Sequence, residues 1–140
     1  MSTMSVGDED GSPDEIELRL GAELTNLPII RSLTSSIAMR ADFDLDAIAD
    51  LKLAVDEACS TLITRAAPEA PLRCVFKVDK DEIRFVVSIH STSDDRPSGD
   101  SFGWRVLTTL TDHANSWVEA DGGQHLVHIE VAKRRADGPA

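Results

Sequence analysis

The stretch that decides the fold is Leu53–Ala66, LAVDEACSTLITRA, together with the residues just before it. Apolar side chains recur there at the spacing of one helical face. The members of this stripe are Ile48, Leu51, Val55, Ala58 and Leu62. We therefore expect a helix that begins near Asp44 or Asp46 and buries this stripe. Glu57 and Thr61 lie one turn apart on a shoulder of the stripe, where they can edge a pocket.

The segments around this helix alternate between strand and helix patterns. Alternating apolar and polar residues predict strands, and apolar residues spaced three or four apart predict helices. The predicted order is a strand from 15, a helix from 26, the helix above, strands over 72–79 and 82–90, a helix from 102, and strands over 117–120 and 126–133. Asn26 can cap the first helix, with Pro28 in its first turn, and Asp100 or Ser101 can cap the last. Strands that are polar on one side predict an α+β fold, a two-layer sandwich with a mostly antiparallel sheet covered on one face by helices.

Length and charge bound the function. The chain has 140 residues and a formal net charge of −11. We expect an acidic, disordered tail over residues 1–14, one domain over 15–133 and a C-terminal tail over 134–140. The negative charge argues against direct nucleic-acid binding and favours a basic protein partner. The start of the chain has no signal-peptide pattern and no apolar run is long enough for a membrane span, so we expect a cytoplasmic protein that does not bind membranes.

The cysteines and histidines carry no recognisable metal or catalytic spacing. Cys59 and Cys74 are expected to be buried free thiols, with a disulfide or a metal pair as the less favoured alternative. The four histidines do not share metal-ligand spacing on one element, so no metal site is predicted and they are interpreted as surface or edge residues. No serine has a recognisable base and orienting group beside it, which argues against a serine hydrolase.

The order of elements, with LAVDEACSTLITRA in its place, resembles the anti-sigma regulatory factors of the RsbW/SpoIIAB type, which belong to the GHKL family of ATPases and kinases. The resemblance covers about residues 15–133. In that family the central helix reads E-A-x-x-N-x-x-x-H, where the Glu is a general base or positions water and the Asn holds Mg²⁺. Glu57 and Ala58 match, whereas Thr61 replaces the Asn and Arg65 the His. Glu57 is thus the candidate catalytic residue; its alternative role is a solvent-facing Glu or one paired with an Arg.

The other nucleotide motifs of the family are changed in this chain. Ser91 stands where the family's D-x-G-x-G motif has the Asp that binds adenine, and the two glycines are replaced by Ser93 and Asp95. The Gly-x-Gly at the start of the next helix reads Ser101-Phe102-Gly103, and only five residues separate the two motifs in place of a long lid. The resemblance therefore implies a degenerate ATP site, with no cofactor expected, or ATP and Mg²⁺ if the site still binds. Its residues are Thr61, Ser91, Ser101 and Gly103.

The first predicted helix carries the candidate partner-binding residue. The family presents a basic residue there that contacts the sigma factor and, competitively, an anti-anti-sigma protein, and Arg31 holds the matching position. Its alternative is an ordinary solvated Arg. The resemblance implies an anti-sigma factor that sequesters an alternative, stress- or sporulation-type sigma factor, is released by a STAS-type anti-anti-sigma protein through partner exchange, and forms a homodimer. Two alternatives are an active serine kinase that phosphorylates the anti-anti-sigma partner with ATP and Mg²⁺, and a scaffold that only dimerises.

Overall fold

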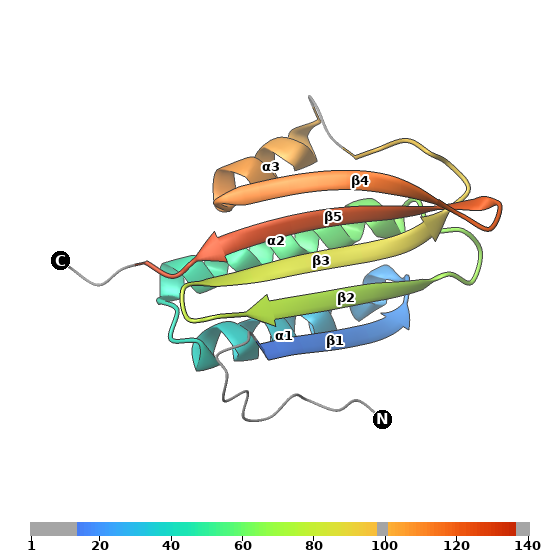
Figure 1. The fold of residues 1–140 in the computed structure, drawn as a ribbon. Helices are drawn as coiled ribbons and strands as arrows, with labels where there is room; N and C mark the ends of the chain where they lie inside the picture. The colour runs from blue at the N-terminus through green and yellow to red at the C-terminus, as the bar shows by residue number, and fades with distance from the viewer. Residues whose placement is uncertain (1–13, 98–100, 137–140) are drawn as a thin grey trace.

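The computed structural model describes residues 14–97 and 101–136, which form one layer of helices over one side of a single sheet (Figure 1). The elements are β1 (Asp14–Gly21), the 3₁₀ turn η1 (Leu24–Asn26), α1 (Leu27–Arg40), α2 (Leu45–Ile63), β2 (Pro71–Val78), β3 (Glu82–Ser91), α3 (Phe102–Leu110), β4 (His113–Asp121) and β5 (Gln124–Arg134). This order confirms the one predicted from the apolar spacing. The predicted tails overlap the undescribed residues 1–13 and 137–140, so the division at 14 and 134 stays a prediction.

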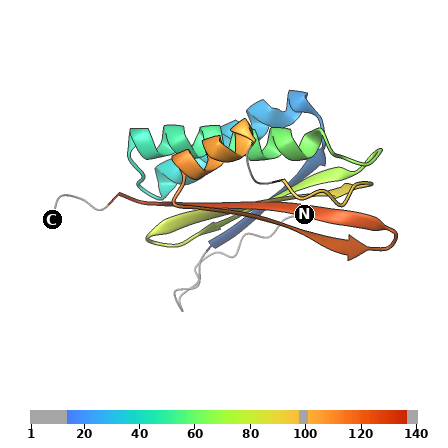
Figure 2. The same ribbon diagram turned by 90° about the horizontal axis from the view of Figure 1, so that it is seen from above.

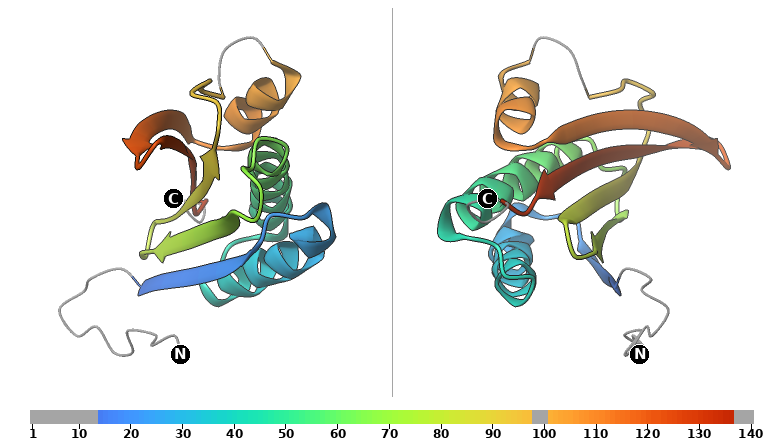
Figure 3. Two further views of the ribbon diagram at one scale, coloured as in Figure 1. Left: turned by 90° about the vertical axis from the view of Figure 1, so that its right-hand side faces the viewer. Right: turned by 60° about the vertical axis from the view of Figure 1, so that its left-hand side comes forward.

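The sheet has five strands in the order β1-β2-β3-β5-β4, and every neighbouring pair is antiparallel. All three helices lie on the same side of it, as the edge-on view shows (Figure 2). The strands twist and curve so that the sheet bends around the helices (Figure 3). The predicted α+β, two-layer sandwich is therefore confirmed, with a sheet that is antiparallel throughout.

The core lies between α2 and the middle of the sheet. The predicted stripe of α2 is buried along its whole length, from Ile48 to Leu62. On the sheet, Phe76 of β2 and Phe85 of β3 are paired residues whose rings lie 4.8 Å apart and tilted by 50°. Such tilted aromatic pairs add to the free energy gained by burying apolar surface. This packing fixes how α2 is rotated relative to its neighbours.

The helix starts agree only in part with the predicted caps. Asp44 caps α2, because its Oδ1 accepts a hydrogen bond from the Ala47 N–H at 2.7 Å. Asn26 occupies the N-cap position of α1, but the prediction that its side chain caps the helix is wrong. Its Nδ2 instead donates to the Gly21 carbonyl at 2.8 Å. The amide therefore ties the end of β1 to the start of α1, a contact that local sequence does not reveal.

The last hairpin is longer than predicted. β4 begins at His113, four residues before the predicted start at Trp117. These extra residues, His113 to Ser116, include one apolar side chain, that of Ala114, so the sequence shows no alternation there. The turn to β5 is where predicted, and Gly122 and Gly123 both have positive φ, a backbone conformation that suits glycine and two-residue hairpin turns.

The face of the sheet opposite the helices carries paired charges. Arg73 of β2 binds Glu17 of β1 through two nitrogens at 3.0 and 3.2 Å, and this hydrogen-bonded pair lowers the pKa of Glu17 and raises that of Arg73. The interpretation of the histidines as surface or edge residues is wrong for His128, which is buried on this face. His128 stacks on Trp117 and contacts Ser88 and Glu119 at 2.6 Å each.

Among the described residues, no helix is both long and apolar enough to cross a membrane.

We expect Asp44→Ala to lower the free energy of unfolding by about 1 kcal/mol, because it removes the only side-chain acceptor seen at the start of α2 among the described residues. Asp44→Asn keeps an acceptor oxygen and should cost only a few tenths of that amount. Urea unfolding monitored by circular dichroism measures both. Equal losses for the two variants would contradict a capping role.

Candidate functional site

Two consecutive carboxylates of α2 face different neighbouring helices. Successive residues of a helix are turned by about 100°, and with the apolar stripe fixed against the sheet, Asp56 faces α1 and Glu57 faces α3. These two sides of α2 contain most of the residues that the sequence singled out. They are not one site, and each has its own chemistry.

On the α1 side, Arg31 is held by Asp56. Its Nη2 lies 2.8 Å from Asp56 Oδ1, and the Arg31 side chain remains 42% exposed. An ion pair this exposed contributes no more than about 1 kcal/mol to stability. Its main effect is to hold one edge of the guanidinium while the rest stays exposed. Arg31 is therefore neither buried nor freely solvated.

A hollow of about 340 Å³ opens between α1 and α2 beside this ion pair. Its lining consists of Arg31, Ala49, Lys52, Leu53 and Asp56. The α2 members of this set were not among the residues predicted from the sequence. The sequence offers one indication of them: Ala49 and Leu53 are apolar residues of this helix that do not belong to the buried stripe.

On the α3 side, the Glu57 side chain lies against Gly103. A Cβ at Gly103 would overlap Oε2 of Glu57 and would lie 3.1 Å from its Cδ. Thr61 Oγ1 donates to the same Oε2 at 3.3 Å. The structure therefore brings together three of the predicted residues, Glu57, Thr61 and Gly103. Gly103 allows the close approach because it has no side chain.

The predicted hydroxyl groups have partners within the chain. Ser101 Oγ accepts the Trp104 N–H at 3.1 Å and caps α3. Ser91 Oγ, at the buried end of β3, accepts the Ser93 N–H at 3.1 Å. Ser91 therefore belongs to the loop after β3, and no described contact joins it to Glu57, Thr61 or Gly103.

Arg65, which replaces the family's His, binds that same loop. Its Nη1 donates to the Asp95 carbonyl at 3.0 Å. The side chain thus ties the end of α2 to the residues that replace the family's glycines. Asp95 contributes its backbone oxygen to this contact.

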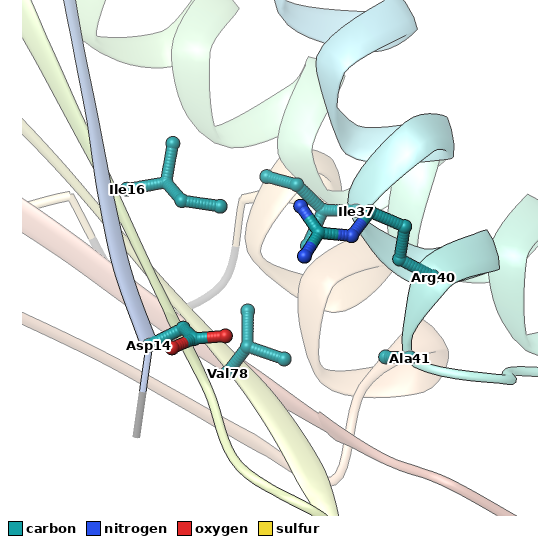
Figure 4. A pocket seen from close by; sticks show the side chains of 6 residues that line it. All are labelled: Asp14, Ile16, Ile37, Arg40, Ala41 and Val78. Atoms are coloured by element: carbon teal, nitrogen blue, oxygen red, sulfur yellow. The ribbon is translucent and has the colours of Figure 1, made fainter. Parts of the chain in front are cut away.

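A second hollow, of about 80 Å³, lies at the other end of α1 (Figure 4). Ile16, Ile37 and Val78 supply apolar walls, and Arg40 and Asp14 extend their charged groups at its rim. It is small and far along α1 from Arg31, and it includes none of the predicted site residues.

The two cysteines are buried free thiols, as predicted. A hydrogen bond with Cys74 and burial raise the pKa of Cys59 well above its usual range. A thiol held neutral in this way is a poor nucleophile. Among the described residues, no three His, Cys, Asp or Glu side chains are grouped as a metal site would require.

With this geometry, comparison with known proteins identifies the class. The chain belongs to the family of histidine kinase-like ATPase domains, which matches residues 20–129. It is similar to the anti-sigma-F factor RsbW of Mycobacterium tuberculosis, with 42% identity over 124 residues that make up 86% of this chain and 74% of that protein. The resemblance to RsbW-type members of this family, inferred from the sequence, is thereby confirmed.

A second group of relatives is named for a different activity. The chain is 30% identical over 84 residues to proteins of Bacillus cereus named serine-protein kinase RsbW. This similarity covers 59% of the chain and 52% of the Bacillus proteins. The relatives thus include both an anti-sigma factor and kinases.

The contact between Glu57 and Gly103 predicts an energetic coupling. Gly103→Ala gains up to about 1 kcal/mol of helix propensity, but in the wild type it must displace the Glu57 carboxylate from Thr61. In a Glu57→Ala background nothing has to move. We expect Gly103→Ala to be more favourable there, by about 1 kcal/mol, in a double-mutant cycle measured by urea unfolding.

The matched control is Asp50→Ala, which removes another half-buried α2 carboxylate, one bound to Lys133 at 3.2 Å. Its effect should simply add to that of Gly103→Ala. A coupling as large for Asp50 as for Glu57 would contradict the assigned contact.

Proposed function

We propose that this protein is an anti-sigma factor that works by binding. It sequesters an alternative sigma factor of the stress or sporulation type, and a STAS-type anti-anti-sigma protein releases that factor by competing for overlapping residues. The proposal includes action in the cytoplasm through a single domain over residues 15–133. It also includes a homodimer, which light scattering would reveal as twice the monomer mass of 15.2 kDa.

The observation that carries this proposal is the state of Arg31. Its guanidinium is positioned by Asp56, stays half-exposed and borders the hollow between α1 and α2. An oriented guanidinium on a rigid helix loses little conformational entropy when it binds a carboxylate, and it can do so through two hydrogen bonds. The name of the mycobacterial relative supports the same function.

Two partners can exchange on this protein by competitive binding alone, without a covalent reaction. When two proteins compete for one surface, a difference of about 1.4 kcal/mol in binding free energy changes their partition tenfold. The net charge of −11 also favours rapid encounter with a basic partner, because complementary charge raises association rates. Relative concentration of the two partners then decides how much sigma factor is free.

The α3 side of α2 supports binding over catalysis. ATP would bring a triphosphate towards the carboxylates of Glu57, Asp94 and Asp95 and would have to displace Glu57 from Gly103. Like charges in partly desolvated surroundings oppose binding by an amount on the order of kcal/mol each. We infer that these residues do not fit the nucleotide, and we assign no step to it.

A second candidate function is a serine kinase that phosphorylates the anti-anti-sigma partner. One observation favours it, the names of the Bacillus relatives. In this alternative Glu57 orients the partner's hydroxyl and Thr61 holds Mg²⁺. Transfer of labelled phosphate from ATP to a STAS-type protein would establish it, and no transfer would remove it.

The main test is co-purification of the tagged chain with each sigma factor of the source organism, expressed one at a time. We expect wild type to retain at least one of them. Arg31→Glu should lower its retention at least tenfold, since loss of a hydrogen-bonded interface charge costs about 2–5 kcal/mol.

Arg40→Glu is the matched control, because it makes the same charge change at the exposed end of the same helix. It should retain the partner as wild type does, and both variants should keep the wild-type circular dichroism spectrum. Equal retention by the two variants would remove Arg31 from the site, and no retention by wild type would contradict the function.

A further inference from the structure

The large apolar side chains that are exposed in the described part of the chain all lie on helical elements. They are Leu24, Ile29, Met39, Leu45, Leu53 and Phe102. The open face of the sheet, in contrast, carries charged side chains that pair with one another, such as Glu17 with Arg73 and Arg84 with Glu82 and Glu130. The exposed large apolar groups are thus found on the helix layer, and a contiguous set of them would mark a surface for a partner.

Within this layer, α2 carries a second apolar row beside its buried stripe. Leu45, Ala49 and Leu53 are spaced four residues apart and point outward, with Leu45 82% and Leu53 57% exposed. At 1.5 Å per residue, the two leucines stand about 12 Å apart along the helix. An exposed leucine alone needs no explanation. Two in line, with a small residue between them, form a continuous track.

This row borders the hollow between α1 and α2. Ala49 and Leu53 give the hollow apolar walls, and Arg31 and Lys52 give it a cationic rim. Asp56 is already engaged by Arg31. Lys52 forms no ion pair with any residue in the described ranges. The hollow therefore suits an aliphatic side chain with a carboxylate next to it.

We propose that this row and hollow dock an amphipathic helix of the sigma factor. The helix presents two aliphatic side chains two turns apart, one over Leu45 and Ala49 and one in the hollow beside Leu53, and an acidic residue that pairs with Lys52. A partner helix has a residue every 1.5 Å, so positions i and i+7 span about 10.5 Å and match the track. The inference rests on the proposed function, since it assigns the occupant to that partner.

A second copy of this chain fits the track less well. It would bring another net charge of −11 to the contact. Its own leucine row is flanked by Asp46, Asp50 and Asp56, with Arg31 and Lys52 as the cations that line the hollow. Like charges facing one another at an interface oppose association. An acidic segment on an otherwise basic partner fits both the rim and the overall charge.

The test compares Leu53→Asp with Ile29→Asp in binding to the sigma factor that the co-purification identifies, by surface plasmon resonance. Ile29 is the matched control, because it is 55% exposed and lies two residues from Arg31, and thus about 200° around α1 on its far flank. We expect Leu53→Asp to weaken binding at least tenfold and Ile29→Asp less than twofold. Lys52→Glu should lower mainly the association rate constant.

The outcomes separate this inference from the proposed function. If Arg31→Glu weakens binding and Leu53→Asp stays within twofold of wild type, the docking helix is wrong and the anti-sigma function stands. If Leu53→Asp alters only the dimer mass or only binding of the STAS-type protein, the occupant is a second copy or that protein, and the inference is overturned. If the wild-type protein binds no sigma factor, both the proposed function and the docking helix are wrong. Wild-type urea midpoints for the variants exclude misfolding as the cause.

Discussion

The interaction on which the rest of the structure depends is the burial of the apolar stripe of α2 against the centre of the sheet. The stripe residues are almost completely removed from solvent, so α2 cannot rotate without exposing them. That constraint sets the directions of the other side chains of the helix. Asp56 must face α1 and Glu57 must face α3, although they are neighbours in sequence.

The two sides of α2 therefore make different contacts. Towards α1, Asp56 holds Arg31 at the rim of an open hollow, and Leu53 continues the surface outward. Towards α3, Glu57 is packed against Gly103 and accepts from Thr61. One helix thus has an ion pair beside an open hollow on one side and a carboxylate packed against a neighbouring helix on the other. This division is the physical basis for proposing a protein that binds partners without needing a nucleotide.

The periodic parts of the fold could be predicted from sequence because their causes are local. The buried stripe of α2, its start near Asp44 and the Gly122–Gly123 turn follow from spacing and turn chemistry. Contacts between distant segments could not be predicted. The Asn26 side chain binds the Gly21 carbonyl instead of capping α1, and His128 is buried where it stacks on Trp117 of the neighbouring strand.

The candidate site divides in the same way. A family pattern located Glu57, Thr61, Gly103 and Arg31 by position, but pattern alone does not say which of them touch. The packing of Glu57 on Gly103 depends on how closely α3 approaches α2, and the hollow at Leu53 depends on the separation of α1 and α2. Both are tertiary distances. The sequence therefore identified the candidate residues, and the structure shows which of them are in contact.

The most direct test of this account is a calorimetric titration of the chain with ATP in excess Mg²⁺. If the Glu57 carboxylate closes the α3 side, the account predicts no saturable binding tighter than about 1 mM, equivalent to about −4.1 kcal/mol. Saturable micromolar binding that Glu57→Ala abolishes would contradict it, because the same carboxylate would then serve the nucleotide.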